Sequence, residues 1–127
     1  MADGHFEPVI ARTATMFGAS PRMRFDLALN QMVATALREQ RIEVRGGGRQ
    51  WRPLVHVLDA AEAFALMAEA PAKDASGEIF NIGANENNVR ILDLAERVAA
   101  TLDGVEIEIA NDDDDLRTFR VQFDKLE

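Results

Sequence analysis

Apolar residues recur at helical spacing in three stretches of the chain, and this periodicity predicts three helices. The stretches are Asp26–Gln40, Asp59–Ala70 and Ile91–Leu102. Asp59 is expected to be the N-cap of the second helix, because its carboxylate can accept a backbone N–H that has no partner within the helix. Pro71 follows this helix at once, which is a common place for a residue that cannot continue a helix. The pattern therefore predicts both ends of the second helix.

Shorter apolar or alternating runs predict about five short strands. The expected strands are Pro8–Arg12, Ile42–Val44, Leu54–Val57, Glu78–Ile82 and Val105–Ile109. Phe119, Val121 and Phe123 also alternate with polar residues and indicate a further strand or extended segment. Asn85–Asn88 is expected to be a polar loop. Three helices and about five strands in this order predict a mixed α/β fold, in a single domain that covers residues 1–127.

The composition is that of a soluble globular protein. Hydrophobic residues make up 47% and charged residues 28% of the 127 residues. The net charge of −8 disfavours nonspecific binding to nucleic acid, which needs Lys and Arg to replace the counterions of the phosphates. No apolar run approaches about 20 residues, so no membrane-spanning segment is expected. The chain has no cysteine and no secretory signal pattern, so the cytoplasm is the expected location.

Arg52 is the strongest candidate for a binding residue. It enters the expected strand Leu54–Val57 just after the glycine run Gly46–Gly48, and seven of the 14 basic residues lie between Arg22 and Arg52. A guanidinium forms bidentate, charge-assisted hydrogen bonds to phosphate oxygens, and a strand beside a turn would hold it rigidly. The alternative is that Arg52 pairs with a neighbouring carboxylate such as Asp59. Gly46–Gly48 itself is expected to be a plain turn, because no Lys-Ser or Lys-Thr pair follows it.

Three other polar features each have a structural alternative. Asn30 lies within the first expected helix, and its amide would either bond a phosphate oxygen or sugar hydroxyl, or simply face the solvent. His56 lies in an apolar strand without a partner motif, so we expect a structural histidine rather than a general base. Asp112–Asp115 lacks the alternating ligands and the glycine turn of a calcium loop, so we expect a solvated loop and no metal site.

Four segments, taken in order, resemble the motifs of one enzyme family. Arg12–Pro21 resembles a strand end followed by a T/N-x-Y-G-P loop, and Arg52–Asp59 resembles the R-x-x-V-H-V-x-D run that follows a glycine turn. Phe80–Gly83 resembles F-N-I-G, and Arg117–Lys125 resembles R-x-Y-x-V-D-x-x-K. Together they are similar to the nucleotide-sugar-binding half of the NAD-dependent epimerases and dehydratases, the extended short-chain dehydrogenase family, and they span most of the chain.

This resemblance implies a site for a nucleoside diphosphate sugar. Arg52 falls on the family's diphosphate-binding arginine, and Asn30 falls on a helix asparagine that contacts the nucleotide sugar. Thr15 falls on a position that often holds Asn near the sugar, although it would equally serve as a β-branched residue at a strand end. Many members have an R-P-G-D segment before the last strand, where this chain has Asn111 and four aspartates. Arg117 is the residue that would substitute for the phosphate-binding arginine of that segment.

Catalysis in this family uses a Y-x-x-x-K pair, and NAD binds to a glycine-rich turn at a helix N-terminus. The chain contains no tyrosine and no G-x-x-G-x-x-G segment. We therefore expect the substrate-binding fragment of an NAD-dependent sugar-nucleotide epimerase or dehydratase, without a complete Rossmann domain, without an NAD site and without turnover of its own. The alternatives are a noncatalytic nucleotide-sugar-binding module, or a module that forms a homo-oligomer through an apolar patch exposed by the missing Rossmann half.

Overall fold

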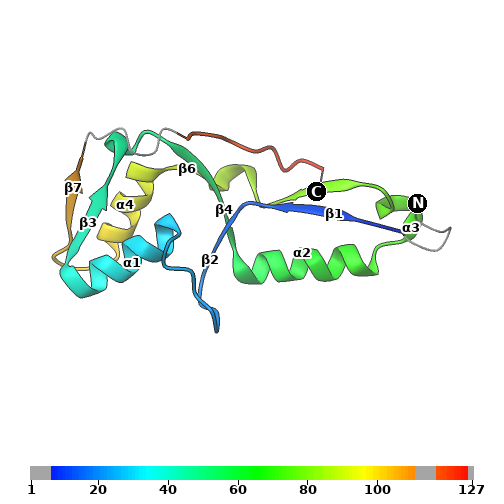
Figure 1. Cartoon of the computed structure of the whole chain (residues 1–127), viewed down its shortest axis with the longest axis horizontal. Helices are drawn as coiled ribbons and strands as arrows, with labels where there is room; N and C mark the ends of the chain where they lie inside the picture. The colour runs from blue at the N-terminus through cyan, green and yellow to red at the C-terminus, as the bar shows by residue number, and fades with distance from the viewer. Residues whose placement is uncertain (1–6, 111–116, 126–127) are drawn as a thin grey trace.

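The computed structural model describes residues 7–110 and 117–125 (Figure 1). The helices are α1 (Ala28–Glu39), α2 (Val57–Glu69), α3 (Ala72–Ala75) and α4 (Ile91–Ala100). The strands are β1 (Ile10–Thr13), β2 (Thr15–Phe17), β3 (Arg41–Val44), β4 (Trp51–His56), β5 (Ile79–Ile82), β6 (Asn88–Arg90) and β7 (Glu106–Ile109). Two 3₁₀ turns, η1 (Gly46–Gly48) and η2 (Asn85–Asn87), complete the described elements. The predicted mixed α/β class is confirmed.

The strands form three small sheets. β1 pairs with β5 and β3 pairs with β7, both in parallel, while β4 lies between the parallel strand β2 and the antiparallel strand β6. Figure 1 shows an elongated molecule, with α1, α4, β3 and β7 at one end and α2, α3, β1 and β5 at the other. β4 runs between these two ends, so residues along β4 can contact both.

Each end of the molecule has its own hydrophobic core. The first core surrounds Ile42 and Val44, which are fully buried, and includes Leu94 and Ala95 of α4. These residues recur on one face of β3 and on one face of α4, as their sequence spacing requires. The second core contains Val55 of β4, Ile82 of β5, Ala60 and Ala63 of α2, and Phe123. β4 therefore contributes to both cores, because Leu54 belongs to the first and Val55 to the second.

The prediction that Asp59 caps the second helix is wrong. α2 begins two residues earlier, at Val57, and its N-cap is His56. The Nδ1 atom of His56 accepts the backbone N–H of Leu58 at 3.3 Å, so the imidazole does what the carboxylate was expected to do. Asp59 lies in the first turn instead, where a negative charge is favourable beside the helix dipole.

Asn85–Asn88 is more ordered than the predicted polar loop. Residues Asn85–Asn87 form η2, and Asn88 is the buried first residue of β6. The Nδ2 atom of Asn88 donates to the carbonyl oxygens of Asn85 (3.0 Å) and Val121 (2.9 Å), and its Oδ1 accepts the backbone N–H of Val121 (2.9 Å). The side chain of Asn88 therefore binds the backbone of Val121 in the way that a neighbouring strand otherwise would.

Residues 117–125, which we call the C-terminal segment, run outside any strand along one side of the molecule (Figure 1, orange to red). Besides Asn88, the side chain of Asn81 donates to the Gln122 carbonyl at 3.0 Å, and Asn85 Oδ1 accepts the Phe123 N–H at 3.1 Å. Lys125 pairs with Glu78 at 2.5 Å. The side chains of Glu78, Asn81, Asn85 and Asn88 thus hold the extended segment that the alternation of Phe119, Val121 and Phe123 predicts.

No helix within the described ranges has both the length and the apolar character needed to cross a lipid bilayer.

Candidate functional site

A cavity of about 520 Å³ lies between α1, β3, the first half of β4 and the C-terminal segment, and we call it the first cavity. Thr15, Arg52 and Arg117, three of the four predicted site residues, line it. Their convergence follows from strand geometry. Arg52 and Leu54 are two residues apart on β4, so their side chains leave the same face of the strand, and Leu54 is the register partner of Thr15.

The Arg52 side chain is held in place by the C-terminal segment. Its Nη1 donates to the carbonyl oxygen of Trp51 at 2.9 Å and to the carbonyl oxygen of Arg117. The guanidinium carbon lies 5.5 Å from the centre of the Phe119 ring, within the range of a cation–π contact. Asp59, the alternative partner, forms no ion pair with any residue that the structure describes. Arg52 therefore lies half-buried in a cavity wall, with its orientation fixed.

The structure does not bring Asn30 into this cavity. Asn30 is buried on α1, and its Nδ2 donates to the carbonyl oxygen of Arg24 at 3.0 Å. It therefore fixes the loop that precedes α1. In that loop Arg24 pairs with Asp26 at 2.5 Å, and Asp26 lines the cavity. The hydrogen bond from Arg24 holds the pKa of Asp26 below its ordinary value, so this carboxylate stays charged.

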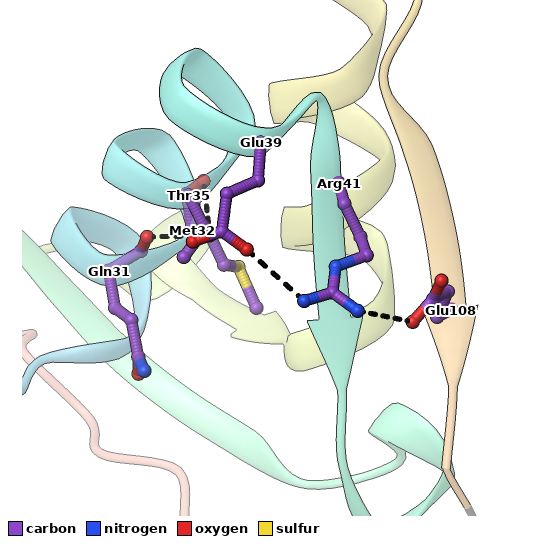
Figure 2. A network of polar contacts seen from close by, with 6 residues as sticks. All are labelled: Gln31, Met32, Thr35, Glu39, Arg41 and Glu108. Atoms are coloured by element: carbon purple, nitrogen blue, oxygen red, sulfur yellow. Dashed lines mark hydrogen bonds and ion pairs between the residues drawn. The ribbon is translucent and has the colours of Figure 1, made fainter.

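The end of the first cavity nearest β7 is rich in ion pairs (Figure 2). Arg41 bridges Glu39 at 3.1 Å and Glu108 at 3.3 Å, and the hydrogen bond to Glu39 raises the pKa of Arg41. Arg45 pairs in the same way with Glu43 at 3.0 Å. Carboxylates thus balance the cationic side chains at this end of the cavity.

A second cavity, of about 460 Å³, lies at the carboxyl ends of β1 and β5. Arg12 and Asn81, which are register partners on these two strands, line it together with Arg120 of the C-terminal segment. Ligands of open α/β sheets bind just beyond the carboxyl ends of parallel strands. Thr15 and Phe119 line both cavities, so the two hollows share a wall.

Arg12, Phe119 and Arg120 were not predicted to be site residues, although they lie in segments that resemble family motifs. Phe119 was expected only as part of an extended segment, and it reaches the cavities because Asn81, Asn85 and Asn88 anchor that segment. Such long-range contacts have no local sequence pattern. A family motif at Arg117–Lys125 is the only signal that could have pointed to this region.

The structure gives His56 two contacts typical of a structural side chain. Besides capping α2, its ring meets Phe17 edge-on, with the ring centres 5.2 Å apart. In the described part of the chain, no three His, Cys, Asp or Glu residues cluster as a metal site would require. Asp112–Asp115, considered above for calcium, lies outside the described residues.

The described residues do not fit NAD. A dinucleotide needs a glycine-rich turn that leads into a helix N-terminus. The three longer helices, α1, α2 and α4, have Leu27, His56 and Arg90 as their N-caps. The glycine run Gly46–Gly48 leads into β4 instead, as a turn that closes the β3–β4 connection.

The first 83 residues match the model of a family described as NAD dependent epimerase/dehydratase family. A UDP-D-apiose/UDP-D-xylose synthase of Oryza sativa subsp. japonica is 43% identical over 60 residues, which are 47% of this chain and 15% of the synthase. This chain therefore spans a small part of the curated relatives that it matches.

Solved structures resemble most of the chain. A dTDP-glucose 4,6-dehydratase of Bacillus anthracis, in complex with NAD, aligns with a TM-score of 0.71 at 24% identity, over 91% of this chain and 36% of the dehydratase. A UDP-glucuronic acid 4-epimerase of Bacillus cereus, in complex with UDP-glucuronic acid and NAD, aligns with a TM-score of 0.65 at 26% identity, over 84% of this chain and 33% of the epimerase. The similarity to about a third of each solved chain agrees with the predicted partial fold.

Proposed function

Because the chain belongs to the NAD-dependent epimerase/dehydratase family, we propose that it is the nucleotide-sugar-binding part of an enzyme that epimerises or dehydrates sugar nucleotides. The diphosphate binds at Arg52 and Arg117 in the first cavity, on the side where Thr15 and Phe119 line both cavities. The nucleoside occupies the first cavity and the sugar occupies the second. The relatives named above, which bind or convert UDP- and dTDP-sugars according to their names, support this assignment.

The observation that carries the proposal is the position of Arg52. Its guanidinium lies in the wall of the first cavity, between a carbonyl of β4 and a carbonyl of the C-terminal segment. These hydrogen bonds fix the plane of the guanidinium. A planar guanidinium that is already fixed in the free protein loses less conformational entropy on binding an anion than a mobile one does. A diphosphate is the anion whose spaced oxygens match this fork.

We further propose that this chain binds and orients the substrate but does not convert it. Hydride transfer needs NAD and an acid–base residue, and the described residues offer no site for NAD. The chain also contains no tyrosine. Binding energy from the nucleoside and the diphosphate would instead position the sugar for catalytic residues on another polypeptide segment.

Isothermal titration with UDP-, GDP- and dTDP-sugars tests the proposed site. We expect binding, with Arg52→Ala weakening it by about 10- to 100-fold, because charge-assisted hydrogen bonds contribute about 1.5–3 kcal/mol. Arg97→Gln is the matched control, because this exposed arginine of α4 lines neither cavity. Equal affinities of the folded Arg52→Ala variant and the unmodified protein would rule out the diphosphate site.

Incubation of the pure chain with NAD and the tightest-binding sugar nucleotide tests the second proposal. We expect no epimerised or dehydrated product by chromatography. Addition of a separately expressed Rossmann half from a family member should then restore turnover if the halves associate. Product formed by the chain alone would contradict the proposal that this chain binds the substrate without converting it.

Three exposed apolar side chains on α2 favour self-association as a second candidate function. The side chains of Leu58, Phe64 and Leu66 remain 69%, 43% and 62% exposed, although α2 also buries Ala60 and Ala63 in the second core. The neighbouring β1–β5 pair is a parallel sheet of two strands, whereas parallel sheets are normally larger and covered on both faces. Light scattering at rising protein concentration would test this candidate, and a strict monomer would count against it.

A further inference from the structure

Two arginine side chains meet on the indole ring of Trp51. Arg90 is the register partner of Trp51 on the antiparallel pair β4–β6, and its guanidinium carbon lies 5.1 Å from the centre of the ring. The guanidinium carbon of Arg120, in the C-terminal segment, lies 4.6 Å from the same ring centre. Both distances are typical of a cation–π contact. Neither arginine forms an ion pair with any residue that the structure describes, so the indole is the partner that holds both cations.

Backbone contacts set the register in which the C-terminal segment passes this ring. The backbone N–H of Trp51 donates to Thr118 Oγ1 at 3.0 Å, and the Phe119 N–H donates to the Trp51 carbonyl oxygen at 3.4 Å. In an extended chain, side chains two residues apart leave the same side, so Thr118 and Arg120 both face Trp51. Phe119 lies between them, points to the opposite side and lines both cavities. The position of Arg120 therefore follows from the backbone pairing at Trp51.

Arg120 connects this ring to the second cavity. Its side chain lines that cavity, whereas Trp51 and Arg90 line neither of the two cavities. An exposed arginine without a partner samples many rotamers, and fixing one of them when a ligand binds costs free energy. Contact with an aromatic ring restricts the guanidinium before the ligand arrives. The ring thus lowers the cost of using Arg120 as a ligand-binding group.

We infer that Trp51 is a positioning residue, which holds Arg120 at the wall of the second cavity so that the guanidinium donates hydrogen bonds to the sugar of a bound nucleotide sugar. This inference rests on the proposed function, which places the sugar in the second cavity. Arg120 is then the residue that contacts the sugar hydroxyls, and Trp51 acts only through Arg120. Arg90 shares the ring but does not line the cavity, so it provides a control cation on the same indole.

Matched ligands isolate the contribution of the sugar. UDP and UDP-glucose, GDP and GDP-mannose, and dTDP and dTDP-glucose would each be titrated into ¹⁵N-labelled protein and followed by NMR. The Kd of the nucleotide divided by the Kd of its sugar derivative is called the sugar ratio. Trp51→Leu should lower the sugar ratio of the responding pair about two- to fivefold, which corresponds to the loss of one cation–π contact. Arg120→Gln should lower it about tenfold, because charge-assisted hydrogen bonds to the sugar are lost as well.

A double-mutant cycle separates positioning from a general structural effect. If Trp51 acts through Arg120, Trp51→Leu should have no further effect on the sugar ratio of the Arg120→Gln variant. Trp51→Phe keeps an aromatic face and should retain most of the sugar ratio. Arg90→Gln and Phe25→Leu are the controls, since one removes a cation from the same ring and the other alters an exposed aromatic residue that lines neither cavity. Both controls should leave the sugar ratio unchanged.

Proton chemical shifts of the unmodified protein test the contact itself, whether or not Trp51→Leu folds. The face of an indole ring shields nearby protons, so the δ-methylene protons of Arg120 should resonate at higher field than those of Arg97. Arg97 is an exposed arginine of α4 that contacts no aromatic ring within the described residues. Equal chemical shifts of the two arginines would show that Trp51 does not hold Arg120, and the inference would be wrong.

The remaining outcomes distinguish this inference from the proposed function. Absence of binding by all six ligands contradicts both together. Binding with an unchanged sugar ratio in Arg120→Gln or in folded Trp51→Leu contradicts this inference alone. Additive effects of the two substitutions also contradict it, as does a Trp51→Phe variant whose sugar ratio is as low as that of Trp51→Leu.

Discussion

Asn88 is predicted to hold one wall of the first cavity in place, although it touches neither cavity. Replacing it by alanine removes three hydrogen bonds, one to Asn85 and two to Val121, all between 2.9 and 3.0 Å. Each contributes about 0.5–1.5 kcal/mol net, so we expect Asn88→Ala to lower the free energy of unfolding by about 3 kcal/mol. The backbone N–H and carbonyl of Val121 lose a partner in the same step, which is the costly part of the change.

Asn88→Asp refines this prediction. The new carboxylate still accepts the Val121 N–H, but an oxygen replaces the donor Nδ2 that faces the carbonyl oxygens of Asn85 and Val121. This repulsion raises the pKa of the new carboxyl in the folded state above its unfolded value of about 4. The free energy of unfolding of this variant is therefore highest below the unfolded pKa and falls as the pH rises through the folded pKa. Asn88→Ala has no such pH dependence.

Urea unfolding followed by the fluorescence of Trp51 is the appropriate assay. Trp51 is the only tryptophan. Its ring contacts Arg120 and its backbone N–H donates to Thr118 Oγ1, and both of these partners lie in the C-terminal segment. For an m-value of about 1.5 kcal/mol/M, a loss of 3 kcal/mol moves the midpoint by about 2 M. Detachment of the segment before global unfolding would appear as an early change in fluorescence that circular dichroism does not show.

Asn87→Ala is the matched control for this experiment. Asn87 is the preceding residue, at the end of η2, and its backbone N–H donates to the carbonyl oxygen of Ala84. Its side chain makes no hydrogen bond within the described residues. We expect a change within about 0.5 kcal/mol. If Asn88→Ala costs no more than Asn87→Ala, the C-terminal segment is held by other contacts. The account of how Arg117 and Phe119 reach the cavity would then be wrong.

Three further predictions concern the fold, one ion pair and the surface of α2. Gly48→Ala should cost about 2–4 kcal/mol in a thermal melt, because its φ is +68° and a Cβ would lie 2.7 Å from two neighbouring side-chain atoms; Gly77→Ala, with a similar φ of +77° but open space around it, should cost only about 1 kcal/mol. An NMR titration should show the pKa of Asp26 below its ordinary value, and Arg24→Gln should return it to that value, whereas an unchanged pKa would deny the ion pair. Leu66→Glu should abolish any concentration-dependent scattering without lowering the melting temperature, because Leu66 is 62% exposed; association that persists in this variant would not involve α2.

The sequence predicts the fold well where the signal is local. The periodic apolar residues of α1, α2 and α4 recur every three or four positions, so a short window contains the whole pattern. β2, β6 and α3 have three or four residues each, which is too short for any period to appear. The N-cap of α2 was missed because histidine is not among the residues preferred at N-caps. The ring nitrogen of His56 can nevertheless accept a hydrogen bond.

The residues of the candidate site also differ in how far a local sequence pattern predicts them. Arg52 was predicted because a glycine turn and a strand flank it in the sequence, and the structure places it in a cavity wall. Asn30 was predicted from its match to a helix asparagine of the family, and in the structure its amide donates to the carbonyl of Arg24. The second cavity was not predicted, because Arg12 and Arg120 lie far apart in the sequence and line one cavity only through tertiary structure.

The order of synthesis gives the C-terminal segment a particular importance. Ribosomes deliver Arg12, Thr15 and Arg52 long before Arg117, Phe119 and Arg120, so a nascent chain that has already formed β4 still has open hollows on this side. A polypeptide cut just after β7 would retain every helix and strand described above yet lack one wall of both hollows. Premature termination at that point should therefore yield a protein with near-normal secondary structure that cannot retain a nucleotide.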